Sequence, residues 1–112
     1  MSDRLYEKLS WQVGDVSIHR LVEVVLCAPV DSLFPEHSAA ELSAYDSWLR
    51  PDYLDEDGNM KLSIHAFLIN AGGMKMIVDT CAGNGKNLPL YDEWKNLNTP
   101  FLENMAELGF PA

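Results

Sequence analysis

The chain has 112 residues, 47% of them hydrophobic, and a formal net charge of −9 at pH 7. This length allows one domain at most, with one core that buries roughly 65% of the surface of the unfolded chain, and the hydrophobic content argues against disorder. The acidity argues against nucleic acid or an anionic membrane as a partner, because the eight basic residues are scattered and offer no stripe that could neutralise phosphates.

The compartment follows from the N-terminus and the cysteines. The first eleven residues are charged and have no apolar signal-peptide region, and no apolar run approaches the length of a membrane span. We therefore expect a cytoplasmic protein in which Cys27 and Cys81 are free thiols that behave as small buried hydrophobic residues.

The first predicted elements are two strands in residues 11–26, which a tight turn at Gly14-Asp15 joins. The alternation gives the second strand an apolar face that Arg20 interrupts and a mixed opposite face. The first face contains Val16, Ile18, Val22 and Val24, and the second contains His19, Leu21, Glu23 and Val25.

A loop in residues 27–37 leads into a short predicted helix. Ser38 and Glu41 match the S-x-x-E capping box that opens a helix, and Pro51 follows its end. Leu42, Tyr45 and Leu49 share one side of this helix. Residues 51–63 are acidic and turn-rich, so we expect them to be exposed.

A hairpin is predicted next, from strands at 64–70 and 74–79 that flank Ala71-Gly72-Gly73. Both strands are largely apolar, so we expect both to be buried. Thr99 can then cap a last helix, with Pro100 at its first position and Gly109 at its end. The apolar side of this helix would be formed by Phe101, Leu102, Met105 and Leu108.

The order of elements predicts an incomplete fold. A helix that follows an apolar strand usually leads into another strand of the same sheet. The sequence ends at Ala112, where that strand would begin. We therefore expect residues 1–112 to form a single partial domain.

Several candidate sites fail on spacing. His19, His37 and His65 have no partner at a metal-ligand spacing, so we expect them to be structural or surface residues. The acidic turn lacks the carboxylates of a calcium loop, because Tyr53 and Ile64 take positions 1 and 12. The Gly-Asn-Gly-Lys segment also lacks the spacing of either phosphate-binding glycine motif.

Two acidic or nucleophilic candidates remain. A thiol enzyme built on Cys81 would need a nearby base, for which His65 is the candidate. Asp79 ends an apolar strand, and a carboxylate there is costly unless it is hydrogen-bonded, paired or exposed at a functional rim. One interpretation is an Asx-type turn that ends the strand. The other is an acid that orients a metal ligand without binding the metal itself.

Four segments, in this order and spacing, resemble the start of a metallo-β-lactamase-fold hydrolase of the branch that includes lactonases and organophosphate hydrolases. They are WQVGDVSIHRLVE near the start, LFP at 33–35, residues 48–84, and TPFLENMAELGFP at 99–111. The resemblance covers nearly the whole chain. It implies an α+β fold, the N-terminal half of an αββα sandwich with a mostly antiparallel sheet and two or three helices.

The resemblance also implies a metal-dependent hydrolase in the intact parent. Two divalent metals, commonly zinc, would generate a hydroxide that attacks a small-molecule lactone, ester or phosphoester. The family binds its metals chiefly through an H-x-H-x-D-H motif, which this sequence lacks. Asp79 matches the family's strand-ending Asp, which supports the metal site from behind the ligands. Leu33, Phe34 and Thr80 would border the active-site mouth.

Two hypotheses follow, in different functional classes. The first is a truncated N-terminal fragment of such a hydrolase that binds no metal and is inactive alone. The second is a non-catalytic binding or assembly module that needs a partner, either the remaining half of the fold or a second copy, because half a sandwich exposes an apolar face and a strand edge. A small thiol enzyme based on Cys81 is a third option.

Overall fold

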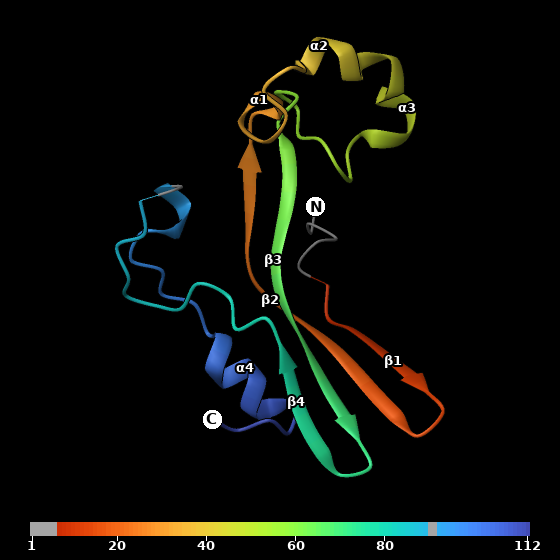
Figure 1. Ribbon diagram of the computed structural model, residues 1–112, viewed down its shortest axis with the longest axis vertical. Coiled ribbons are helices and arrows are strands. Elements are labelled where there is room, and N and C mark those ends of the chain that lie inside the picture. The colour runs from red at the N-terminus through yellow and green to blue at the C-terminus, as the bar shows by residue number, and fades with distance from the viewer. Residues whose placement is uncertain (1–6, 90–91) are drawn as a thin grey trace.

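The computed structural model describes residues 7–89 and 92–112, which form a four-stranded antiparallel sheet with short helices around it (Figure 1). The strand order is β1-β2-β3-β4. The strands are β1 (Leu9–Val13), β2 (Val16–Ala28), β3 (Met60–Ala71) and β4 (Met74–Val78). The helices are α1 (Val30–Leu33), α2 (Ala39–Leu42), α3 (Asp46–Leu49) and α4 (Phe101–Glu107), with 3₁₀ turns η2 (Ser43–Tyr45) and η3 (Asp92–Trp94). The predicted α+β class is confirmed.

The long strands β2 and β3 run the length of the molecule and carry the helical segment α1–α3 at one end (Figure 1). The predicted turn at Gly14-Asp15 joins β1 to β2, and Gly72-Gly73 joins β3 to β4. Both connections are two-residue turns, and Gly14, Gly72 and Gly73 all have positive φ, as tight hairpin turns require. Strand β3 begins at Met60, four residues earlier than the predicted 64, because Met60 to Ser63 pair with the end of β2.

A bulge in β2 corrects the predicted alternation. Val22 pairs with His65 and Val24 pairs with Ile64, so the register shifts by one residue between them. Since neighbouring strand residues point to opposite faces, Val22 and Val24 lie on opposite faces of the sheet. The expectation that both share one face was therefore wrong.

One face of the sheet packs against α4 and forms the core. Ala66 and Leu68 of β3 are fully buried there beside Leu21 of β2. The C-terminal part of the chain contributes Phe101, Met105 and Phe110 to the same cluster. Helix α4 covers this face near β4 (Figure 1). A second set of buried apolar residues lies at the far end of β2, namely Leu26, Ala28, Val30 and Leu54.

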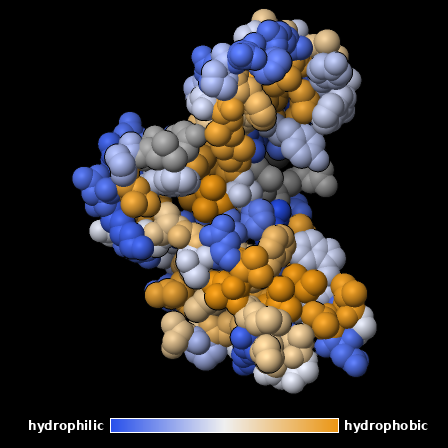
Figure 2. All heavy atoms as spheres, in the orientation of Figure 1, coloured by the Kyte–Doolittle hydropathy of each residue, from blue (hydrophilic) through white to orange (hydrophobic). Residues whose placement is uncertain are grey.

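The opposite side of the sheet, which we call the apolar face, is solvent-exposed. The register aligns three rows of side chains across it: Val13-Val16-Ala71-Met74, Trp11-Ile18-Ile69-Met76 and Leu9-Arg20-Phe67-Val78. Arg20 is the one charged member. Five of the residues expose between 38% and 64% of their surface: Trp11, Val13, Met74, Met76 and Val78. Figure 2 shows hydrophobic residues gathered over the lower part of the sheet.

Strand β4 was predicted to be buried, and that expectation was wrong. All five of its residues are exposed. The strand forms one edge of the described sheet. Its apolar side chains therefore have a neighbouring strand on one side only. Its Lys75 reaches toward α4, where Nζ donates a hydrogen bond to the carbonyl oxygen of Gly109 at 2.6 Å and lies 5.6 Å from the centre of the Phe110 ring.

The helical segment differs from the prediction in its details. Residues expected to be loop form α1, and the single expected helix is divided into α2, η2 and α3. Ser38 does precede the first helical residue, but its side chain makes no capping bond. The capping box is absent, and Glu41 Oε2 lies 2.8 Å from Nδ1 of His37.

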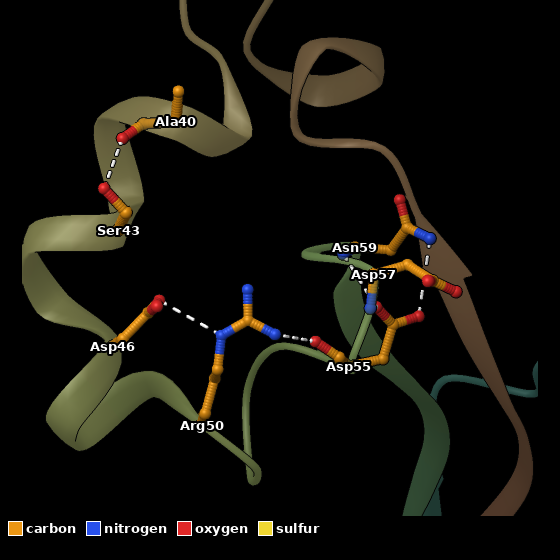
Figure 3. Close-up of polar contacts among 7 residues, drawn as sticks. All are labelled: Ala40, Ser43, Asp46, Arg50, Asp55, Asp57 and Asn59. Atoms are coloured by element: carbon orange, nitrogen blue, oxygen red, sulfur yellow. Dashed lines mark hydrogen bonds and ion pairs between the residues drawn. The ribbon is translucent and has the colours of Figure 1, made fainter.

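Arg50 connects this segment to the turn before β3 (Figure 3). Its Nε lies 3.1 Å from Oδ1 of Asp46, and Nη1 donates to the carbonyl oxygen of Asp55. The Asp55 carboxylate in turn accepts the backbone N–H groups of Asp57 and Asn59, each at 2.9 Å. Residues 51–59 therefore form a hydrogen-bonded turn, and the expected exposure is found for only part of it, because Leu54 is buried.

Helix α4 ends as predicted and begins differently. Gly109 has φ +89° and ends the helix. The N-cap is Pro100 rather than Thr99, whose side chain bonds elsewhere. Leu102 was expected on the packed side but exposes 55% of its surface.

Both cysteines are free thiols. Cys27 is exposed, which contradicts its expected burial, and Cys81 is half-buried. Within the described residues, no helix combines the length and the apolar composition that crossing a bilayer requires.

Candidate functional site

The loop that follows β4 carries Asp79, the main candidate from the sequence. Oδ1 of Asp79 accepts a hydrogen bond from the backbone N–H of Cys81 at 2.8 Å. This is an Asx turn, in which a side chain takes the place of a backbone acceptor. The carboxylate is exposed at the end of the strand, so it is accessible to a group outside this chain.

The backbone of this loop is strained. Asp79 has φ +66° and Cys81 has φ +62°, and Gly83 follows at +87°. Left-handed conformations are uncommon for residues with a side chain and cost about 1–3 kcal/mol each, so the surroundings must hold them in place.

Glu23 provides one such support. It is 4% exposed, and both carboxylate oxygens accept backbone N–H groups from the loop. Ala82 donates to Oε1 at 2.9 Å and Gly83 donates to Oε2 at 2.8 Å. A buried carboxylate is stable only when such donors replace its lost hydration. Glu23 therefore joins the middle of β2 to the loop after β4.

Cys81 is unsuited to nucleophilic catalysis. Its side chain packs against the core cluster around Leu21. Burial, together with the negative charges of Glu23 and Asp79, raises the pKa of Cys81 to about 12. Because the thiolate is the nucleophile, very little of the reactive form exists near neutral pH. His65, the candidate base, lies among the strand residues of the opposite face and pairs with Val22, so the fold does not bring the two together.

A groove of about 610 Å³ opens beside the loop, between β4 and α4. Its polar end is formed by Glu23, Thr80, Gly83 and Asn84. Its remaining wall is mostly apolar and includes Leu68, Ile77, Phe101, Leu102, Met105 and Phe110. Thr80 is thus brought to the edge of a concave surface next to Asp79.

The other two expected rim residues lie elsewhere in the fold. Leu33 ends α1 and Phe34 follows it, and each exposes about half of its surface. They lie beyond the far end of β2, at the top of Figure 1, whereas Asp79 follows β4 in the middle of the molecule. Their assignment to an active-site mouth stays a prediction.

The histidines do not converge. His19 Nδ1 lies 2.6 Å from the hydroxyl of Ser10, and His65 Nδ1 lies 2.8 Å from the hydroxyl of Ser63. His37 is on the helical segment, bound to Glu41. Across residues 7–89 and 92–112, no group of three or more His, Cys, Asp or Glu side chains is arranged to hold a metal ion. The residues that the structure describes therefore do not fit a metal centre.

Glu23 was not identified from the sequence as a site residue, although a signal was present. The alternation placed it on the same face as Leu21, between apolar neighbours. An acid at an inward-facing strand position needs hydrogen-bond donors, so it predicts a buried polar contact. The sequence could not say which N–H groups would supply them.

No protein-family model and no curated protein matches the chain. One solved structure with a matching fold is described as "hydrolase AbOPH in beta lactamase superfamily". The match has a TM-score of 0.60 and 22% sequence identity, and it covers 92% of this chain and 31% of that chain. This chain therefore spans about a third of the length of that hydrolase. The likeness shows the fold alone: the four-stranded antiparallel sheet with short helices has the α+β arrangement of the matched part of that hydrolase.

Proposed function

We propose that this chain is the N-terminal portion of a metal-dependent hydrolase of the lactonase and organophosphate-hydrolase branch, and that it is inactive alone. The proposal is supported by the extent of the structural match, in which nearly all of this chain corresponds to about a third of a hydrolase described as belonging to the beta lactamase superfamily. The intact protein would act on a small-molecule lactone, ester or phosphoester.

In this proposal Asp79 supports a metal centre whose ligands come from polypeptide outside this chain. The exposed position of Asp79 and its fixed loop are compatible with that role. Thr80, Leu33 and Phe34 would border the mouth of the completed site. The metals would be two divalent ions, commonly zinc in proteins that this sequence resembles.

The partner that completes the fold would bind the apolar face and the edge strand β4. Five large side chains of that face are solvent-exposed, and β4 ends the described sheet. Exposed apolar surface and unpaired strand edges both favour association. The partner would be the remaining part of the hydrolase fold.

The test is an assay of the purified chain for metal content and for hydrolysis of a lactone, an aryl ester and a phosphotriester. We expect no stoichiometric metal and no turnover. A polypeptide that continues past Ala112 through an H-x-H-x-D-H motif should gain both, and Asp79→Ala in that longer protein should weaken metal retention. Stoichiometric zinc with turnover in the 112-residue chain would overturn the proposal.

The exposed apolar face also favours a second candidate, a non-catalytic binding or assembly module. Such a module would associate with itself or with another protein and would not need a catalytic segment. Light scattering of the purified chain addresses both candidates, since each requires a partner. A compact monomer with a cooperative melt over a wide concentration range would count against both. Full activity in the longer polypeptide would favour the hydrolase.

A further inference from the structure

We infer that Glu23 is a positioning residue, whose buried carboxylate holds the loop after β4 in the one conformation that presents Asp79 at the edge of the sheet. The inference rests on the proposed function only for the identity of the group that Asp79 faces, namely a metal centre. The geometry itself is a property of this chain.

The carboxylate of Glu23 is matched to the loop by two hydrogen bonds. The two oxygens of Glu23 take the N–H groups of two successive residues, Ala82 and Gly83, at 2.9 and 2.8 Å. Two consecutive N–H groups that point at one anion fix the direction of the intervening peptide. The side chain is almost completely buried, so water cannot take its place without a large rearrangement.

The backbone of the loop is strained at two residues. Asp79 and Cys81 both adopt left-handed φ values. The Asp79–Cys81 hydrogen bond lies within the same turn and moves with it. The contact with Glu23 comes from a different strand and is anchored by the paired β2 and β3. It is therefore an attachment that can fix the loop relative to the sheet.

Glu23, Thr80 and Gly83 all line the polar end of the groove between β4 and α4. Release of the loop would move Asp79 and this end of the groove together. Glu23 would then act on a site without touching any group bound there.

The experiment measures hydrogen exchange of backbone amides by NMR in the 112-residue chain and in Glu23→Gln. The Gln side chain keeps the size of Glu but replaces one acceptor oxygen with a donor. We expect the amides of Ala82 and Gly83 to exchange about 10- to 100-fold faster. We also expect faster exchange at Cys81, whose N–H bonds Asp79 and not Glu23. An unchanged Cys81 amide would reduce Glu23 to a local contact and overturn the inference.

Glu23→Asp is the second variant, because it keeps the charge and shortens the reach by one methylene. It should release the loop as Glu23→Gln does. Glu56→Gln, at an exposed turn position, is the matched control and should leave all three amides unchanged. Amides in β2 and β3 report whether each variant remains folded.

If both Glu23 variants unfold, amide exchange in the unmodified chain tests the inference. If Glu23 fixes the loop at Asp79, its contacts and the Asx turn open together, so the Cys81, Ala82 and Gly83 amides should show the same opening equilibrium within about twofold. Independent opening of Cys81 would overturn the inference. Loss of loop protection in the variants, together with an inactive longer polypeptide, would refute the proposed hydrolase and leave the role of Glu23 intact.

Discussion

The side-chain amide of Asn84 forms hydrogen bonds with both the backbone carbonyl and the backbone N–H of Thr99. The Asn84 side-chain amide donates to the Thr99 carbonyl oxygen at 2.9 Å, and the Thr99 backbone N–H donates to Asn84 Oδ1, also at 2.9 Å. The Thr99 hydroxyl adds a third contact at 3.3 Å. This pair closes the segment between β4 and α4. It explains why Thr99 does not cap the helix, because its polar groups are already engaged.

Asn84→Ala should lower the free energy of unfolding by about 1 kcal/mol, because the hydrogen bonds to Thr99 are lost at an exposed site where water replaces them in part. Urea denaturation followed by circular dichroism measures the change. Asn87→Ala, at an exposed position three residues further on, is the control and should have little effect. Equal losses in the two variants would show that the pair does not stabilise the fold.

Acid should weaken the fold through Asp55. Burial acts to raise the pKa of this carboxyl, but hydrogen bonds from the Asn59 and Asp57 amides and from the Asn59 and Cys27 side chains outweigh it and lower the pKa below 3.8. A lowered folded-state pKa stabilises the protein above the unfolded value, and that stabilisation is lost as the pH falls through the folded value.

The urea midpoint should therefore fall as the pH drops below about 4, and less steeply in Asp55→Asn than in the unmodified chain. Asp57→Asn, which removes a more exposed carboxylate of the same turn, should keep the original slope. Parallel pH profiles for all three proteins would contradict the role of Asp55.

Cys81 should react much more slowly than Cys27 with iodoacetamide at pH 8. Burial and the charges of Glu23 and Asp79 raise the pKa of Cys81 to about 12, whereas Cys27 is exposed. Peptide mass spectrometry should show Cys27 modified at least about tenfold faster in the folded chain. In urea the two rates should converge. Selective early modification of Cys81 would instead support the thiol-enzyme hypothesis.

The raised pKa of Cys81 also has a consequence for stability. The folded state favours the protonated thiol, so its contribution is complete below the unfolded pKa near 9 and is lost as the pH rises toward about 12. Cys81→Ala should remove this part of the alkaline destabilisation. Urea midpoints of Cys81→Ala and the unmodified chain are compared between pH 8 and 10.5. The same decrease with pH in both proteins would show that Cys81 does not cause the alkaline destabilisation.

Met76→Lys should reduce association of the chain. Met76 lies in the central row of the apolar face and is 38% exposed, so a charge there would have to be buried in any contact with a partner surface. Sedimentation velocity across a concentration series measures the effect. Leu102→Lys places the same charge on the exposed side of α4 and should change association less. A larger loss of association in Leu102→Lys than in Met76→Lys would show that the chains associate through the side that carries α4.

Sequence periodicity predicted the two hairpins well, because tight glycine turns and alternating apolar residues are local signals. The turn at Gly14-Asp15 and the helix end at Gly109 were both found where predicted. The bulge at Val22–Val24 was not predictable, since a register shift depends on the partner strand. The exposure of β4 was also missed, because an apolar strand looks the same in sequence whether or not another layer covers it.

The candidate site was predicted only in part. The Asx turn expected as one interpretation of Asp79 is confirmed, whereas the role of Asp79 beside a metal site stays a prediction. Glu23 was missed as a partner of the loop because the contact joins residues 59 and 60 positions apart. The capping role expected of Thr99 failed because Thr99 bonds Asn84, a partner 15 positions away that local spacing does not reveal, whereas Glu41 of the expected capping box bonds the nearby His37.

The long sequence separation between Glu23 and its amide partners also sets an order of events during folding. The loop after β4 cannot reach its final geometry until β2 and β3 have paired, because only then is the carboxylate in place. Closing such a non-local contact is slower than forming either hairpin turn. We therefore expect the strands to pair before the loop that carries Asp79 reaches its final geometry.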